Sequence, residues 1–174
     1  MVNGHSKITD QGDFIEKKIY VSNCHVLRDN WLEKYQNFSD TNPYLVDVLS
    51  VAPLIEDGAP EGSAVIRMEK IDVVSRLEDA LSLSAHLAPT IFRPKLIHET
   101  LMVLNKCMVQ TLSNQCSGSY FFNSDFRLSN IVVTPEYNLR VIDPDSYFES
   151  YNFHNYEKLA MTHTQMLGVI RKYL

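Results

Sequence analysis

The chain has 174 residues, of which 45% are hydrophobic and 21% charged, and its formal net charge at pH 7 is -5. This length suits one globular core, and the composition is that of a folded protein rather than a disordered or fibrous one. The acidic balance argues against a nucleic-acid binder, because such proteins neutralise phosphates with clustered Lys and Arg. No stretch approaches the roughly 18 apolar residues that a membrane span requires.

The cysteines and the first residues bear on the compartment. Cys24, Cys107 and Cys116 fit neither a disulfide framework nor a zinc site, which indicates a reducing compartment. Residues 1–13 lack the apolar core of a secretory signal. We therefore expect a cytoplasmic protein without a membrane span, and a polar N-terminus is also compatible with an export system that reads no hydrophobic signal.

The first half of the chain favours strands. Alternating apolar and polar residues predict a strand over 14–22, which follows a turn at 10–13 as part of a hairpin. Residues 29–38 predict a short helix, and 44–55 and 63–71 predict two further strands.

The second half favours helices around a hairpin. The period becomes helical over 73–89 and again over 94–115, where the expected apolar stripe is Ile97, Leu101, Leu104, Met108 and Leu112. Short strands are expected over 120–123, 130–134 and 139–143. The tail over 155–174 predicts a helix with Leu159, Met166, Leu167 and Ile170 on its buried side. This succession of elements is an α+β order.

Three polar residues form the most informative pattern. Asn130 follows Asp125 by five residues, and Asp143 follows Asn130 by thirteen, across a strand, a turn and a second strand. Asp and Asn are common in turns, but three of them in register with this hairpin are much less so. Their oxygens are hard ligands brought to one edge of a hairpin, which is what a divalent cation between phosphates requires.

This segment resembles the protein kinase superfamily, in which a catalytic loop H-R-D-x-x-x-x-N is followed by a metal-binding Asp. The resemblance implies that Asp125 acts as the base or positions the attacking hydroxyl, and that Asn130 and Asp143 hold Mg²⁺. It places Arg127 on the phosphate, because many serine/threonine kinases have a Lys two residues past the catalytic Asp. It also implies ATP as cofactor and a single compact bilobal domain, with a reduced N-lobe sheet over 1–70 and a truncated helical C-lobe over 71–174.

The resemblance extends upstream of the motif. The predicted first strand stands where the family has its V-A-I-K strand, and alternation favours Lys17 over its neighbour Lys18 as the lysine that contacts the phosphates. Glu33, in the following helix, is the expected partner of that lysine. Glu69 and Ile71 are expected near the adenine, in the strand and hinge of the N-lobe.

The chain also departs from the family. Asn123 replaces the usual His, Pro144 and Asp145 replace Phe-Gly, and no G-x-G-x-x-G precedes Lys17. Little chain follows Asp143 in which to form an activation segment. This compaction resembles the minimal effector kinases that enteric bacteria inject through type III secretion, which implies action in a host cytosol and a protein substrate or an activating protein partner.

Three functions remain open at this point. The leading hypothesis is an ATP- and Mg²⁺-dependent phosphotransferase that acts on protein Ser/Thr, with no nucleic acid as partner. The alternative is a pseudokinase that serves as a protein-binding module, which the missing glycine-rich loop favours. A small-molecule kinase shares the loop, but usually has a large C-terminal lobe for which this chain has too little room.

Overall fold

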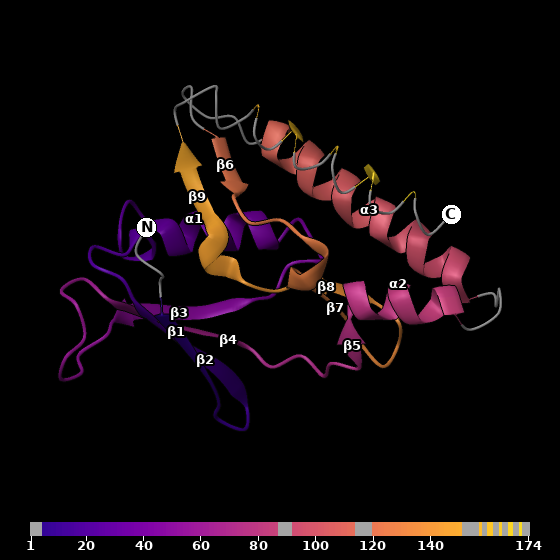
Figure 1. Cartoon of the computed structure of the whole chain (residues 1–174). Helices are drawn as coiled ribbons and strands as arrows, with labels where there is room; N and C mark the ends of the chain where they lie inside the picture. Colours follow the sequence, from indigo (N-terminus) through magenta and orange to yellow (C-terminus); the bar gives the residue numbers. More distant parts are fainter. Residues whose placement is uncertain are drawn as a thin grey trace. The chain divides into compact units, whose positions relative to one another are not determined.

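The computed structural model describes residues 5–86, 92–113 and 120–150, together with residues 157, 160, 161, 164, 167, 168 and 171 of the tail. The chain divides into two compact units (Figure 1). The first unit ends at Ile71 and leaves out Asn42–Leu45, which belongs to the second unit. The expected division into lobes over 1–70 and 71–174 of one domain stays a prediction.

The first unit is built on a four-stranded antiparallel sheet with the order β1–β2–β4–β3. Its strands are β1 (His5–Asp10), β2 (Phe14–Tyr20), β3 (Val48–Pro53) and β4 (Ala64–Glu69). Successive side chains of a strand point to opposite faces, and the burial of β2 and β4 alternates accordingly. The buried face of these two central strands is formed by Lys17, Ile19, Ala64, Ile66 and Met68.

An α-helix packs against this sheet. The short 3-10 helix η1 (His25–Leu27) leads into α1 (Trp31–Ser39), which contacts β3 and buries Trp31, Tyr35 and Phe38. The Tyr35 hydroxyl donates a hydrogen bond of 2.9 Å to the Val46 carbonyl. Residues 31, 35 and 38 are spaced for one helix face, while Glu33, Gln36 and Asn37 are exposed.

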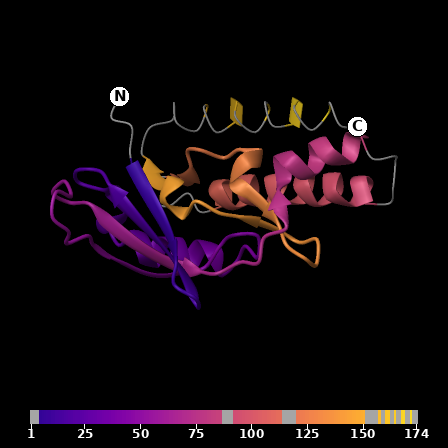
Figure 2. The same cartoon turned by 60° about the horizontal axis from the view of Figure 1, so that its bottom comes forward.

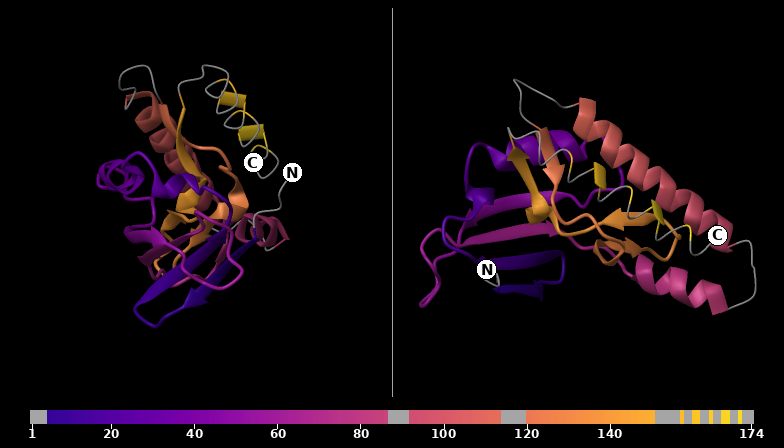
Figure 3. Two further views of the ribbon diagram at one scale, coloured as in Figure 1. Left: turned by 90° about the vertical axis from the view of Figure 1, so that its left-hand side faces the viewer. Right: turned by 45° about the horizontal axis from the view of Figure 1, so that its top comes forward.

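Up to Ser150, the described part of the second unit contains a pair of packed helices, a small sheet and a two-stranded ribbon. Helices α2 (Leu77–His86) and α3 (Phe92–Ser113) lie side by side (Figure 2). A three-stranded sheet has the order β5–β7–β8, and β6 pairs with β9 (Figure 3). These strands are β5 (Ser75–Arg76), β6 (Tyr120–Asn123), β7 (Ile131–Val133), β8 (Leu139–Val141) and β9 (Tyr147–Ser150).

The segment between α1 and β3 is bonded to strand β8 of the second unit. Leu45 forms a parallel bridge with Val141, and the Val141 N–H donates to the Tyr44 carbonyl at 2.6 Å. The Arg140 side chain donates to the Leu45 carbonyl at 2.7 Å. This explains why the strand predicted over 44–55 begins only at Val48, since its first residues pair elsewhere.

The same segment is fastened to α3 through a buried polar cluster. The fully buried Asn42 donates Nδ2–H to Oε1 of Gln110 at 2.8 Å and to Sγ of Cys107 at 3.5 Å. Burial raises the pKa of the Cys107 thiol to about 11. The thiol therefore stays protonated at neutral pH, which suits a packing role rather than a reactive one.

The predicted α+β class is confirmed, and the strands over 14–22 and 63–71 and the helix over 29–38 lie close to their observed counterparts. The helix predicted from residue 73 is wrong at its start. Val74 donates its N–H to the Val133 carbonyl at 2.9 Å, and β5 precedes α2. The backbone at 74–76 is therefore bonded to β7 instead of forming a helical turn.

The buried faces of the later helices also differ from expectation. On α3, Ile97 and Leu104 are buried as predicted, but Leu101 is 38% exposed and Thr100 is fully buried. The Thr100 hydroxyl donates to the Leu96 carbonyl at 2.7 Å, which satisfies its polar group inside the core. In the tail, Leu167 was expected to be buried but is 39% exposed. The other predicted tail positions lie outside the described residues, and so does the side chain of Leu112 in α3.

Among the residues that the structure describes, no helix is long and apolar enough to cross a membrane.

Candidate active site

The loop that carries Asp125 is shaped by the residues around it. Strand β6 ends at Asn123, whose buried side chain accepts the Asp125 N–H through Oδ1 at 2.8 Å. Phe126 and Leu128 are buried, whereas Arg127 between them faces solvent. The loop is thus anchored by its apolar side chains, and the charged residues are left accessible. Within the described part of the chain, the buried Nδ2 of Asn123 has no hydrogen-bond partner.

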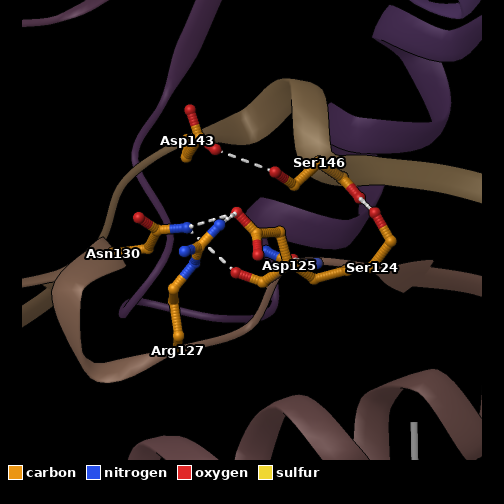
Figure 4. A network of polar contacts seen from close by, with 7 residues as sticks. Ser124, Asp125, Arg127, Asn130, Asp143 and Ser146 are labelled. Atoms are coloured by element: carbon orange, nitrogen blue, oxygen red, sulfur yellow. Dashed lines mark hydrogen bonds and ion pairs between the residues drawn. The ribbon is translucent and has the colours of Figure 1, made fainter. Parts of the chain in front are cut away.

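Asp125 is surrounded by donors from its own loop (Figure 4). Its Oδ2 pairs with the Arg127 guanidinium and accepts from Nδ2 of Asn130 at 3.3 Å. The same Asn130 nitrogen donates to the Asp125 carbonyl at 2.9 Å. The hydrogen bond and the negative charge of Asp125 raise the pKa of Arg127. The negative charge of Asp143 raises it further. The pair is open to water, with side-chain exposures of 61% for Arg127 and 40% for Asp125.

Asp143 lies where the chain leaves β8 and enters the 3-10 helix η3 (Pro144–Ser146). Its backbone is left-handed, with φ at 75°, a conformation that is uncommon for residues other than glycine and that Asp and Asn adopt most readily. The Ser146 hydroxyl donates to Oδ2 of Asp143 at 2.8 Å. The Ile142 N–H donates to the Asn130 carbonyl at 2.9 Å, which holds the end of β8 beside the entrance to β7.

The structure therefore brings Asp125, Asn130 and Asp143 together within the second unit (Figure 4). Nδ2 of Asn130 donates to Asp125, so the Oδ1 atom of the same amide remains as the acceptor for a ligand. An amide oxygen and the Asp143 carboxylate are hard ligands that suit Mg²⁺, which takes one or two protein groups and completes its shell with water and phosphate oxygens. No group of three His, Cys, Asp or Glu within the described ranges could hold a metal.

The two candidate lysines lie on opposite faces of β2. Lys17 is 6% exposed and lies on the buried face of the sheet. Lys18 points to the other face, where its Nζ pairs with Oε2 of Glu56 at 2.8 Å. Of the two lysines, Lys17 is thus the one held on the buried face of the sheet.

The other three residues predicted for the nucleotide site in the first unit are Glu33, Glu69 and Ile71. Glu33 is exposed and lies on the side of α1 away from Trp31 and Tyr35, which is a poor position for a carboxylate meant to orient a buried amine. Oε1 of Glu69 accepts a hydrogen bond from the Asp47 N–H at 2.7 Å, which connects the end of β4 to the residue before β3. Ile71 is half-buried just beyond β4. Their roles toward a nucleotide stay predictions.

Sequence reasoning missed Ser124 and Ser146, which join the two acidic positions. The Ser146 carbonyl accepts both the N–H of Ser124 at 2.9 Å and its hydroxyl at 3.0 Å. Serine is common in every loop, so no signal in a single sequence separates these two residues from the others.

No family model matches the chain, and no curated protein matches it. Solved structures similar to it include WbdD, which is 20% identical with a TM-score of 0.49 over 83% of this chain and 31% of WbdD. Monomeric WbdD is 17% identical with a TM-score of 0.49 over 95% of this chain and 37% of its own. A double mutant of the PknI kinase domain of Mycobacterium tuberculosis is 12% identical, with a TM-score of 0.49, over 84% of this chain and 57% of its own.

The chain thus spans about a third of the length of WbdD and little more than half of the PknI kinase domain chain. The likeness is distant, so the geometry of the site itself carries the functional interpretation.

Proposed function

We propose that this chain is an ATP- and Mg²⁺-dependent phosphotransferase that acts on hydroxyl groups of protein Ser or Thr. The observation that carries the proposal is the convergence of Asp125, Asn130 and Asp143 at the β7–β8 hairpin, with the left-handed backbone of Asp143 at its end. Phosphoryl transfer needs little covalent help from a protein, and mainly needs oxygen ligands and charges held in fixed positions. This hairpin supplies such an arrangement.

Each residue has a distinct part in the proposed reaction. Asp125 accepts a hydrogen bond from the acceptor hydroxyl and takes its proton as that oxygen bonds to the γ-phosphorus of ATP. The bond from this phosphorus to the bridging oxygen breaks at the same time, and ADP leaves. Asn130 and Asp143 would hold Mg²⁺, and the bound ion would neutralise part of the negative charge of the phosphates. Arg127 keeps the Asp125 carboxylate in place and carries a positive charge for the transferred phosphate. Lys17 is the phosphate-binding amine of the first unit.

A pseudokinase is the second candidate, and one observation favours it. The Asp125 carboxylate is engaged by both Arg127 and Asn130, so a substrate hydroxyl has to compete with two donors for it. In that case the chain binds a protein partner and transfers no phosphate. The activating partner, the host cytosol as site of action and the likeness to secreted effector kinases stay predictions under either function.

The test is a thermal-shift titration with ATP, with and without Mg²⁺. A ligand present at 100 times its Kd stabilises the native state by about 2.7 kcal/mol. For a chain of this size that raises Tm by roughly 5–10 °C. Asp143→Asn should lose most of the Mg²⁺-dependent part of the shift, because it removes the charged metal ligand.

Glu136→Gln is the matched control, since it removes one carboxylate from an exposed turn of the same hairpin and should keep the full shift. Equal shifts in wild type and Asp143→Asn would remove Asp143 from the metal site. A wild-type protein that responds to no nucleotide would favour the pseudokinase.

A further inference from the structure

The geometry points to Ser146 as a positioning residue that sets the orientation of the Asp143 carboxylate for Mg²⁺, with Ser124 holding Ser146 in place. This inference rests on the proposed function and adds to it a residue whose hydroxyl determines metal affinity. It also connects the metal-holding position to the loop that carries Asp125, because Ser124 directly precedes that residue in the chain.

The first observation concerns the way in which Asp143 is held. Asp143 is the N-cap of η3, where an Asp side chain ordinarily accepts the free N–H groups of the first helical turn. Its side chain makes no such cap bond. Instead Oδ2 accepts the Ser146 hydroxyl at 2.8 Å, while the Ser146 N–H donates to the Asp143 carbonyl at 3.1 Å. Ser146 therefore fixes both the backbone and the carboxylate of Asp143.

The second observation is that Ser146 is itself anchored. Its carbonyl accepts two hydrogen bonds from Ser124, one from the N–H at 2.9 Å and one from the hydroxyl at 3.0 Å. Figure 4 shows the chain of contacts running from Ser124 through Ser146 to Asp143. The hydroxyl that meets Asp143 thus comes from a residue whose backbone is held at both ends.

The consequence follows from what a divalent ion demands of a carboxylate. With Oδ2 bonded to Ser146, the carboxylate cannot rotate freely about its χ2 angle, and Oδ1 is kept in one direction. Mg²⁺ requires near-ideal ligand geometry, so a freely rotating carboxylate binds it less well. Outer partners of metal ligands typically change metal affinity by about 10- to 100-fold. We expect the lower end of that range, because Ser146 is half-buried and water can replace part of its bond.

The experiment measures how the ATP-induced melting shift depends on Mg²⁺ concentration. Ser146→Ala should raise the Mg²⁺ concentration at half-maximal shift by about tenfold, and should leave the shift by ATP without Mg²⁺ unchanged. Ser146→Thr keeps the hydroxyl and should restore the wild-type midpoint. Ser124→Ala loses the hydroxyl bond to the Ser146 carbonyl but keeps the N–H bond. Its Mg²⁺ midpoint should therefore rise by only about two- to threefold, less than in Ser146→Ala.

Ser63→Ala is the control for a purely structural effect. Ser63 is buried in the first unit, and its hydroxyl donates to the Pro60 carbonyl at 2.7 Å, so the variant loses a comparable hydrogen bond away from the site. It should lower Tm without moving the Mg²⁺ midpoint. An unmoved midpoint in Ser146→Ala, an equal movement in Ser63→Ala, or failure of Ser146→Thr to restore the midpoint would each overturn the inference and leave the proposed function standing. A wild-type protein with no Mg²⁺-dependent shift would overturn both.

Discussion

Replacing Asp125 by Ala separates its chemical role from its structural role. The bonds lost are the ion pair with Arg127 and the weak contact of 3.3 Å from Asn130, while the backbone bond between Asn130 and the Asp125 carbonyl remains. Both charged side chains are open to water, and exposed pairs of this kind contribute about 0.2–1 kcal/mol to stability. We therefore expect Tm to fall by no more than roughly 2–4 °C.

The expected effect of Asp125→Ala on the rate is far larger than its effect on stability. A positioned base contributes about 100- to 10,000-fold to proton transfer, which corresponds to roughly 2.7–5.4 kcal/mol of barrier. Binding of Mg²⁺-ATP, measured by thermal shift, should stay close to wild type, because Asp125 acts on the acceptor. Phosphotransfer is assayed with labelled ATP, on the purified chain alone and with host-cell lysate that supplies an acceptor and a partner.

The matched control for Asp125→Ala is Asp10→Ala. Asp10 forms an exposed ion pair of 2.8 Å with Lys70 in the first unit, so its loss removes a similar surface contact away from the site. It should leave transfer unchanged. Wild-type transfer by Asp125→Ala would show that this residue is not the base, and an equal loss of transfer in both variants would attribute the effect to the fold.

Two further predictions test the first unit. Lys17→Ala should reduce the nucleotide-induced melting shift, whereas Lys18→Ala, which removes only the exposed pair with Glu56, should keep it; a loss in Lys18→Ala alone would reverse the choice of lysine. Gly62→Ala should destabilise the protein at least twice as much as Gly58→Ala in thermal melts. Both glycines have a left-handed backbone, which costs an L-residue about 1–2 kcal/mol, but only at Gly62 would a Cβ lie 2.6 Å from a backbone nitrogen, that of Asn23. Equal losses would show that this close approach relaxes at no cost.

The sequence predicted best those elements whose pattern is local. The residue pattern located β2 and β4, and alternation put Lys17 and Lys18 on opposite faces, because the period of a strand assigns each residue to a side. The spacing of Asp125, Asn130 and Asp143 likewise predicted that the three residues lie close together, since a short hairpin brings its two ends side by side. These predictions needed no knowledge of how distant segments meet.

The failures arose where distant contacts decide the outcome. Leu45 looked like the start of a strand in the first unit, but pairs with Val141, almost a hundred residues later. Thr100 is buried in α3 because its hydroxyl bonds within the helix, so apolarity was the wrong criterion for that face. Ser146 acts on Asp143 through a hydroxyl that any loop serine also carries. Only the folded structure distinguishes it.

The path of the chain through Asn42–Leu45 limits how the protein can be cut. A fragment that begins at Asp72 contains all of α3 and β8, but lacks the residue that pairs with Val141 and the amide that meets Gln110. Such a fragment leaves the backbone of β8 open along one side and loses the buried hydrogen bond between Asn42 and Gln110. The two units are therefore interleaved along the chain, and genetic truncation, proteolysis or recombination at residue 71 cannot yield the second unit intact.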